Sequence, residues 1–194
     1  MTMEERKKTL RKSIKERAAG LDREYIRKAD RAIFNYVTSL PEYRDGEIIF
    51  CFAGAREEIN TAPIIEDALS RGKQVGVPKC IAKGIMEVRR IRSLGDLEPG
   101  KYGILEPGSQ AALIQPEEID LAVVPCLSCS SDGRRLGYGG GYYDRYMEHT
   151  QAVKAVICRK RLMCEEIPMD THDAAMDIVI SEEGIRRLRK QNLC

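Results

Sequence analysis

The stretch from residue 47 to residue 77 constrains the fold more than any other part of the chain. Glu47–Phe52 is an apolar run of strand length, a helical pattern capped by Asn60 or Thr61 closes at Gly72, and Gln74–Val77 is apolar again. Strand, helix and strand in so short a span form a βαβ unit, whose strands pair in parallel through a right-handed crossover. The chain is therefore predicted to build a parallel sheet with helices packed on it.

The flanking segments extend this pattern. Thr2-Met3-Glu4-Glu5 has the form of a capping box and opens a basic helix that runs to about Ala19. Asp22 caps a second helix that ends before Pro41, and Leu121–Val124 is a continuous apolar run typical of a strand buried on both faces. Further strands are predicted over residues 85–91, 153–157 and 178–180, with a loop over 95–110 and a last helix over 182–190. The expected fold is one α/β domain spanning residues 1–194, with a mainly parallel central sheet flanked by helices in a Rossmann-like, three-layer arrangement.

Residues with chemical potential concentrate in one glycine-rich stretch, Arg134-Arg135-Leu136-Gly137-Tyr138-Gly139-Gly140-Gly141-Tyr142-Tyr143-Asp144-Arg145-Tyr146. Its glycines permit positive φ and close backbone approach, so several peptide N–H groups can face one ligand. A helix after the glycines would aim its N-terminus at the same point, and the two leading arginines suit phosphate oxygens. Asp144 is a carboxylate of the kind that holds Mg²⁺ beside nucleotide phosphates. The alternative is a flexible surface loop with exposed tyrosines.

The glycine pattern matches neither of two common nucleotide motifs. The Gly-Lys-Ser/Thr of a P-loop is absent, and a Gly-x-Gly-x-x-Gly frame that starts at Gly137 meets Tyr142 where its last glycine is required. In open α/β sheets, ligands bind beyond the carboxyl ends of the strands. Two connections are expected there: residues 53–61, which follow Phe52, and the glycine-rich loop, which follows Val124. A ligand between them would meet carboxylates on one side and backbone N–H groups on the other.

Composition excludes several classes of function. Hydrophobic content of 43% and charged content of 32% are ordinary for a soluble globular protein, and a net charge of +2 does not indicate a nucleic-acid binder. No apolar run is long enough to cross a membrane, and residues 1–17 lack the apolar core of a signal peptide. We therefore expect a cytoplasmic protein that has no nucleic-acid or membrane partner and is a monomer or a weak homo-oligomer.

The cysteines and histidines indicate no metal centre by themselves. Seven scattered cysteines without an export signal favour reduced thiols. Cys126-Leu127-Ser128-Cys129 is a C-x-x-C, for which zinc binding and redox chemistry must be considered, but no second C-x-x-C follows. The two histidines, His149 and His172, show no ligand spacing. The favoured interpretation is that Cys126 and Cys129 are small packing residues at a strand end, and no role is assigned to the histidines.

The chain resembles the 5-formyltetrahydrofolate cyclo-ligase family, also called methenyltetrahydrofolate synthetase. That family carries a proline, a few residues, and then Gly-x-Arg-Leu-Gly-x-Gly-x-Gly-Tyr-Tyr-Asp; here Pro125 is followed by the run Gly133 to Asp144. Supporting matches run in order through most of the chain. They are Lys7 to Arg11, Glu58-Ile59-Asn60-Thr61, Gly72-Lys73, Val77-Pro78, Glu106-Pro107, Asp173 and Met176-Asp177-Ile178-Val179.

The resemblance implies ATP- and Mg²⁺-dependent closure of 5-formyltetrahydrofolate to 5,10-methenyltetrahydrofolate, with release of ADP and phosphate. It implies that Arg135 and Tyr142 act in catalysis and that Asp144 and Asp173 hold Mg²⁺. The ATP-binding residues would be Lys7, Arg11, Arg135, Leu136, Gly137, Tyr138, Gly139, Gly140, Gly141, Tyr142 and Tyr143. The folate would contact Ala53, Glu58, Tyr138, Gly139, Gly140, Gly141 and Tyr142.

The sequence departs from the family pattern at a few positions. Cys129 and Ser130 stand where an aromatic residue and Asp are common, and Gly140 and Tyr138 stand where some members carry Lys and Arg. These departures leave open a folate or nucleotide binder without turnover. Two of these residues also have purely structural interpretations. Asp173 could cap the last strand, and Glu58 could be a solvated acid on the surface. A nucleic-acid protein that uses the basic N-terminal helix, or another small-molecule kinase, are the remaining alternatives.

Overall fold

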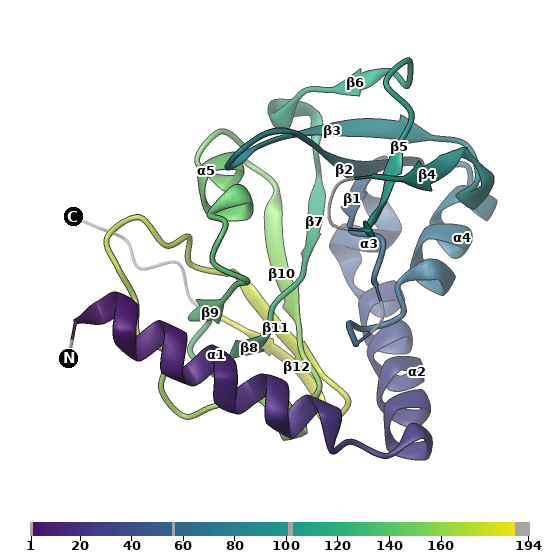
Figure 1. Cartoon of the computed structure of the whole chain (residues 1–194). Helices are drawn as coiled ribbons and strands as arrows, with labels where there is room; N and C mark the ends of the chain where they lie inside the picture. The colour runs from purple at the N-terminus through teal and green to yellow at the C-terminus, as the bar shows by residue number, and fades with distance from the viewer. Residues whose placement is uncertain (1, 56, 101–102, 189–194) are drawn as a thin grey trace.

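A central sheet of eight strands organises the computed structural model, which describes residues 2–55, 57–100 and 103–188 (Figure 1). Its strand order is β12-β11-β10-β7-β1-β2-β3-β6. The strands are β1 (Ile48–Cys51), β2 (Gln74–Ala82), β3 (Ile85–Ile91), β6 (Leu113–Ile114), β7 (Leu121–Val124), β10 (Val153–Ile157), β11 (Ile178–Ser181) and β12 (Gly184–Arg187).

The helices and two small ladders surround this sheet. The helices are α1 (Met3–Ala19), α2 (Arg23–Ser39), α3 (Pro41–Asp45), α4 (Ala62–Ser70) and α5 (Tyr142–Met147), with 3₁₀ turns over Leu94–Asp96, Pro116–Glu118 and Lys160–Leu162. Strand β4 (Leu97–Pro99) pairs with β5 (Leu105–Pro107), and β8 (Ser128–Cys129) pairs with β9 (Arg135–Leu136).

The centre of the sheet is parallel and its edges are antiparallel. Strands β2, β1, β7, β10 and β11 pair in parallel, whereas β3 and β12 pair antiparallel with β2 and β11, and β6 pairs antiparallel with β3. In the centre, Ile49 of β1 lies beside Val75 of β2 on one side and beside Leu121 of β7 on the other. Helix α4 connects β1 to β2, so the predicted βαβ unit and the mainly parallel sheet are confirmed.

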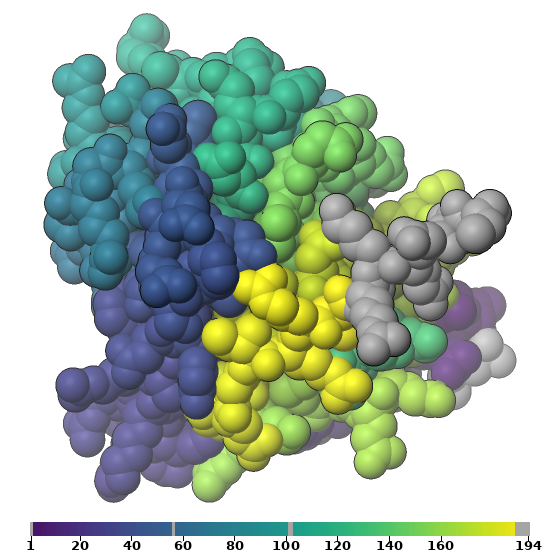
Figure 2. Space-filling view, turned by 180° about the vertical axis from the view of Figure 1, so that it is seen from behind, coloured from purple at the N-terminus to yellow at the C-terminus, as the bar shows by residue number. Residues whose placement is uncertain are grey.

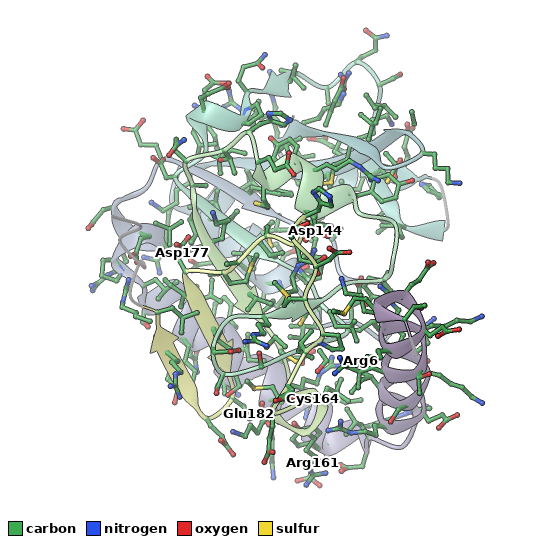
Figure 3. All side chains as sticks on the ribbon, turned by 90° about the vertical axis from the view of Figure 1, so that its left-hand side faces the viewer. Arg6, Asp144, Arg161, Cys164, Asp177 and Glu182 are labelled. Carbon is green, nitrogen blue, oxygen red and sulfur yellow. The ribbon has the colours of Figure 1, made fainter. Side chains whose placement is uncertain are left out.

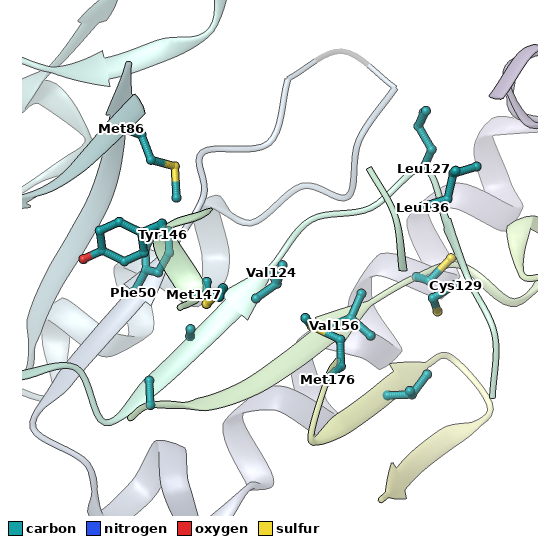
Figure 4. Close-up of a cluster of buried hydrophobic side chains, with 14 of the residues drawn as sticks. Phe50, Met86, Val124, Leu127, Cys129, Leu136, Tyr146, Met147, Val156 and Met176 are labelled. Carbon is teal, nitrogen blue, oxygen red and sulfur yellow. The ribbon is translucent and has the colours of Figure 1, made fainter. Parts of the chain in front are cut away.

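Alternate residues of the central strands face two separate hydrophobic clusters. In β1, Ile49 and Cys51 face the cluster that α2 and α4 cover, while Phe50 faces the opposite cluster, to which Ile14 of α1 and Met147 of α5 contribute. Figure 4 shows the second cluster, where Phe50, Tyr146 and Met147 meet near one end and Leu127, Leu136 and Cys129 near the other. Seen from behind, β12 lies beside α2 (Figure 2). The expected three-layer arrangement follows from this alternation, because each buried strand needs cover on both faces.

Local capping chemistry explains where the helices begin. The Thr2 hydroxyl accepts a hydrogen bond from Glu5 N while the Glu5 carboxylate accepts from Thr2 N, which completes the predicted capping box. Asp22 caps α2 through Tyr25 N, as predicted. At α4 the Asn60 side chain accepts from Ala62 N, whereas the Thr61 hydroxyl turns away and donates to the carbonyl of Phe52. Thr61 therefore stands at the N-cap position without a side-chain cap hydrogen bond, and the Asn60 side chain accepts from the first helical N–H instead.

The predicted last helix over residues 182–190 is wrong for the part that the structure describes, because residues 184–187 form β12. Gly184, at φ +145°, turns the chain directly after β11, and Ile185 then pairs with Ile180. The free edge of β11 offers backbone hydrogen bonds that outweigh the weak helical pattern. Residues 189 and 190 lie outside the described residues.

The region from 78 to 110 also contains more order than its sequence indicates. Strand β2 continues through Pro78 to Ala82 and forms a hairpin with β3, and the predicted loop over 95–110 contains the β4–β5 ladder. The sequence did not predict these strands because Pro78 and Pro107 lie in them, and proline is rare inside sheets. No helix among the described residues is long and apolar enough to cross a membrane.

The strand order creates one place where ligands can bind. From β1 the chain moves to β2 on one side, while β7, β10 and β11 extend the sheet on the other. The connections after β1 and β7 therefore diverge at the carboxyl edge and leave a crevice between them, which is where open α/β sheets bind ligands.

Candidate functional site

A cavity of about 840 Å³ occupies this crevice. Its walls come from α1, from the connection after β1, from the β2–β3 hairpin, and from the loop between β9 and α5. Ligand cavities in proteins typically measure roughly 300–1,000 Å³. The cavity is therefore large enough for an extended ligand or for two ligands side by side.

The glycine loop, residues 137–141, forms one wall and is held in place by arginines from two directions. Arg11 of α1 donates from Nε to the carbonyl of Gly137 at 2.9 Å. Arg145 donates from Nη1 to the carbonyls of Gly140 at 3.0 Å and of Gly84, in the β2–β3 turn, at 3.2 Å. A fixed loop can hold its remaining backbone groups in place for a ligand without ordering them on binding.

The loop requires glycine at several positions. Gly139 has φ +100° and Gly141 has φ +67°, a region that other residues rarely adopt. A Cβ added at Gly140 would lie 2.6 Å from the Tyr142 ring, so a side chain there would displace that ring. Helix α5 does follow the loop as predicted, but it has only six residues and contributes a weak dipole.

Two ion pairs line the same wall. Lys7 of α1 pairs with Asp173, and both side chains are mostly buried. Arg135 of β9 donates from Nη2 to Asp144 Oδ1 at 2.8 Å and from Nη1 to the carbonyl of Pro125 at 3.1 Å, while its Nε is buried and has no hydrogen-bond partner in the described part of the chain. The Arg135 guanidinium also lies 5.6 Å from the centre of the Tyr143 ring. A buried donor without a partner is a feature that an anionic ligand can satisfy.

The opposite wall carries Glu58. Its carboxylate accepts from Ala55 N at 2.9 Å, which folds the connection after β1 back on itself. Desolvation within the cavity, and next the Glu58 carboxylate, raise the pKa of the Tyr138 phenol, although about half of the Tyr138 side chain is exposed. Burial likewise raises the pKa of Tyr143. Both tyrosines therefore remain protonated donors at neutral pH.

Arg159 fixes the backbone that carries Glu58. It directly precedes the 3₁₀ turn after β10 and is 3% exposed. Its Nη1 donates to the carbonyl of Glu57 and its Nη2 to the carbonyl of Glu58, both at 2.8 Å. Nε and Nη2 also bind the two carboxylate oxygens of Asp30 in α2, at 2.7 and 3.0 Å. The sequence did not indicate a role for Arg159, whose only signal is a charged residue two positions after a buried parallel strand.

The structure brings all the predicted site residues to this one cavity, although their roles stay predictions. They are Lys7, Arg11, Ala53, Glu58, Arg135, Leu136, Gly137, Tyr138, Gly139, Gly140, Gly141, Tyr142, Tyr143, Asp144 and Asp173. Arg134 is different: it is half exposed, pairs with Asp132 at 3.0 Å and lies outside the cavity. Of the two arginines that lead the glycine-rich stretch, only Arg135 therefore lines the cavity.

Other expected structural residues have the environments that their patterns indicate. Tyr146 and Met147 are buried, and His149 and His172 are exposed. Asp177 accepts from Lys154 N at 2.9 Å and so braces β10, which is a structural task. Glu106, which belongs to one of the supporting sequence matches, is 3% exposed, lines the cavity and accepts from Cys80 N.

Metal-ligating groups gather around the C-x-x-C pair, which the sequence favoured as packing residues, together with Cys158, which the sequence did not place beside them. Among the described residues, no group of three carboxylates or histidines is close enough to hold an ion, and the one group found is Cys126, Cys129 and Cys158. The carboxylates of Asp144 and Asp173, which are the predicted Mg²⁺ ligands, are paired with Arg135 and Lys7 instead. Mg²⁺ is usually held by one or two carboxylates together with substrate phosphates, so these residues fit a metal that arrives with a nucleotide.

Comparisons with known proteins agree on one family. The sequence profile described as the 5-formyltetrahydrofolate cyclo-ligase family matches residues 3–182. A protein of Schizosaccharomyces pombe named probable 5-formyltetrahydrofolate cyclo-ligase is 32% identical over 80% of this chain and 85% of its own length. The 5-formyltetrahydrofolate cyclo-ligase of Mus musculus is 28% identical over 95% of this chain and 97% of its own. The NMR structure of Aquifex aeolicus 5,10-methenyltetrahydrofolate synthetase superimposes with a TM-score of 0.83 at 27% identity, and the match covers 97% of this chain and 95% of that one.

Proposed function

The chain belongs to the 5-formyltetrahydrofolate cyclo-ligase family, and on that premise we propose that its cavity closes 5-formyltetrahydrofolate to 5,10-methenyltetrahydrofolate at the expense of ATP and with Mg²⁺. The observation that carries the proposal is the composition of the cavity walls. One wall holds backbone amides and the cations Lys7, Arg11 and Arg135, and the other holds the carboxylate of Glu58. The two halves suit an anionic nucleotide and a pterin ring that presents N–H donors.

The cationic wall is the proposed ATP site. Lys7 and Arg11 are four residues apart on α1 and so share a face. Arg11 is already hydrogen-bonded to the glycine loop, and Arg135 carries the buried Nε described above. These groups surround the region in which the γ-phosphate would lie, and preorganised cations and amides stabilise the charge of phosphoryl transfer.

The carboxylate wall is the proposed folate site. Glu58 would accept hydrogen bonds from the pterin's ring N–H and amino group in the bidentate manner of a carboxylate. Tyr143 is stacked on Phe50, with ring centres 5.9 Å apart, and lies next to Arg135. It is therefore occupied by the protein core, so the ring proposed to lie against the pterin is that of Tyr142.

These residues support a reaction in two steps without a protein nucleophile. The formyl oxygen attacks the γ-phosphorus of ATP, an O–P bond forms, and ADP leaves. N10 then attacks the activated formyl carbon and loses its proton as the C–O bond to phosphate breaks. The chain's part is to hold the two substrates in line and to neutralise charge, which Lys7, Arg11 and Arg135 would do.

Mg²⁺ would be held by Asp144, with Asp173 as a second candidate, and would supply charge neutralisation at the phosphates. Arg135 Nη2 and Ala174 N both donate to Asp144 Oδ1, so Asp144 Oδ2 would be the oxygen that binds the metal. Asp144→Asn should lose Mg²⁺-dependent turnover while remaining folded, and wild-type activity in that variant would remove Asp144 as a ligand.

The test of the function is direct. Purified protein is mixed with Mg-ATP and 5-formyltetrahydrofolate, and the absorbance of the methenyl product is followed together with ADP release. Arg11→Gln should raise the KM for ATP, whereas the matched variant Lys12→Gln should not, because Lys12 is exposed on the same helix and outside the cavity. Tight binding of both substrates without growth of the methenyl absorbance would favour a binder that has lost turnover. Equal effects of the two variants would contradict the proposed ATP site.

The departures from the family pattern do not by themselves argue for lost turnover. Cys129, in β8, and Ser130, directly after it, are fully buried and do not line the cavity. The ring of Tyr142 fills the space beside Gly140. The proposed reaction needs neither Cys129 nor Ser130 as a reacting group, and it needs no side chain at position 140.

A further inference from the structure

Three cysteines from separate parts of the chain converge at the carboxyl edge of the sheet. Cys158 directly follows β10, and Cys126 lies two residues after β7. Because β7 and β10 are parallel neighbours, with Val124 beside Val156, both cysteines emerge at the same edge. Cys129 reaches the same point from β8, and the three sulfur atoms all lie within 4.8 Å of one another.

The cluster is both sheltered and accessible. Cys129 and Cys158 are buried, and Cys126 is partly exposed. Cys126 and Cys158 line the cavity described above, so an ion could enter by that route. Cys129 pairs across the β8–β9 ladder with Arg135, which places the cluster beside the proposed ATP site.

The spacing of the sulfurs suits a thiophilic metal ion. Zn–S bonds of about 2.3 Å in tetrahedral geometry put the sulfurs roughly 3.8 Å apart. The observed separations exceed this by about 1 Å at most, a difference that small side-chain rotations remove. Zinc accepts three sulfur ligands when the fourth position of its coordination tetrahedron stays open, here toward the cavity.

We propose that Cys126, Cys129 and Cys158 form a three-thiolate site for one thiophilic cation of the Zn²⁺ class, with its fourth position open to the cavity. Binding forms three S–metal bonds and releases the thiol protons to solvent. Three thiolates and one divalent ion leave a net charge of −1 beside Arg135. The occupied site therefore opposes an anionic ligand in the same cavity and acts as an inhibitory site rather than as part of the reaction.

The test uses metal alone, without nucleotide or folate. Reduced protein is titrated with Cd²⁺ under anaerobic conditions, and the ultraviolet charge-transfer absorbance of thiolate–cadmium bonds is recorded; Zn²⁺ is then added as the competitor. One equivalent of Cd²⁺ should produce the band and Zn²⁺ should abolish it. Cys126→Ser and Cys158→Ala should each weaken binding by more than the roughly 10- to 100-fold seen when an outer-shell partner is lost.

Cys80→Ser is the matched control, because the Cys80 side chain lines the same cavity but lies outside the cluster. Its band and stoichiometry should equal those of the unaltered protein. Absence of a one-equivalent band, its survival in Cys126→Ser, or its loss in Cys80→Ser would overturn the proposal. Circular dichroism establishes folding, and partly exposed Cys126 provides the answer if Cys158→Ala does not fold.

This test is independent of the proposed function. A protein that binds Cd²⁺ as expected but forms no methenyl product would refute the enzymatic proposal alone. A protein that turns over but shows no charge-transfer band would refute the metal site alone. If both hold, a saturating equivalent of Zn²⁺ should slow turnover in the unaltered protein and in Cys80→Ser, but not in a variant that lacks a ligand and retains activity.

Discussion

Replacing Arg159 by methionine would test how the protein holds its carboxylate wall. Methionine keeps much of the length of the side chain and removes its charge and donors. The change deletes two hydrogen bonds to Asp30 and one each to the carbonyls of Glu57 and Glu58. Asp30 is left as a largely buried carboxylate, since its side chain is 12% exposed.

The expected cost to stability follows from that burial. Breaking a buried ion pair by removing one partner costs about 3–5 kcal/mol, mainly because the remaining charge loses its compensation. Asp30 keeps some contact with water and also accepts from Asn60 N, so the lower end, about 3 kcal/mol, is expected. For a chain of this size, each 1 kcal/mol shifts the melting temperature by about 2–4 °C, which gives a loss of roughly 6–12 °C.

A kinetic effect should accompany the loss of stability, because Arg159 positions the backbone that carries Glu58. The KM for 5-formyltetrahydrofolate should rise about tenfold, equivalent to ~1.4 kcal/mol of binding free energy, while the KM for ATP changes little. Thermal unfolding and steady-state kinetics at a temperature where the variant is folded measure the two effects separately. A purely structural role would alter both KM values alike.

Two further variants make the result decisive. Arg161→Met is the matched control: the Arg161 side chain is 60% exposed, lies well away from Asp144 (Figure 3), forms a 3.6 Å ion pair with Asp22 and lies 4.1 Å from the centre of the Tyr25 ring. Such a surface pair contributes about 0–1 kcal/mol. Adding Asp30→Asn to Arg159→Met should cost less than the sum of the single changes, because the orphaned charge disappears. A melting temperature of Arg159→Met within 2 °C of the unaltered protein corresponds to a stability loss of about 1 kcal/mol or less. That result, together with an unchanged KM for folate, would refute the reasoning.

The remaining predictions concern the two walls and one surface ion pair. Glu58→Gln should raise the KM for folate more than the KM for ATP in steady-state kinetics; equal effects would count against a pterin contact. Gly139→Ala should cost about 1–3 kcal/mol of backbone strain at φ +100° and raise the KM for ATP, whereas Gly72→Ala, at φ +77° with no atom within 4 Å, should show the strain in thermal unfolding but leave that KM unchanged. A similar rise of KM in both would contradict a ligand role for the loop. Hydrogen bonds from Arg187 hold the pKa of the Glu42 carboxyl below its ordinary value of 4.5. The stabilisation that the Glu42–Arg187 ion pair gives to the folded protein is therefore present above about pH 4.5 and is lost as pH falls through the lowered pKa. Glu42→Gln should therefore flatten the acid limb of a urea-unfolding series by about 0.2–1 kcal/mol, and an unaltered limb would show that the pair is inert.

The elements that the sequence predicted well are those with local causes. The caps at Thr2 and Asp22 depend on side chains that reach backbone groups three residues away, and both are present in the structure. The strand at Leu121–Val124 is apolar at every position because both of its faces are covered. The prediction failed at residues 184–187, where a neighbouring strand edge rather than the local pattern selects the conformation.

Site residues divide in the same way. The glycine loop can be predicted from its own residues, because the positive φ at Gly139 and Gly141 favours glycine whatever surrounds the loop. Arg159 has no such mark, because its partners Asp30, Glu57 and Glu58 lie more than a hundred positions away along the chain.

The amino-acid sequence by itself determined the periodic segments, the helix caps and a loop that only glycine can form, because each depends on residues within a few positions of one another. Tertiary structure alone decided which strand edges meet, which charges share a cavity and which thiols converge. Cys126 and Cys158 illustrate the difference: they are neighbours only because β7 and β10 pair in parallel. That pairing is stabilised by the burial of both faces of the sheet. The buried surface comes from many segments of the chain, so no short stretch of sequence determines the pairing.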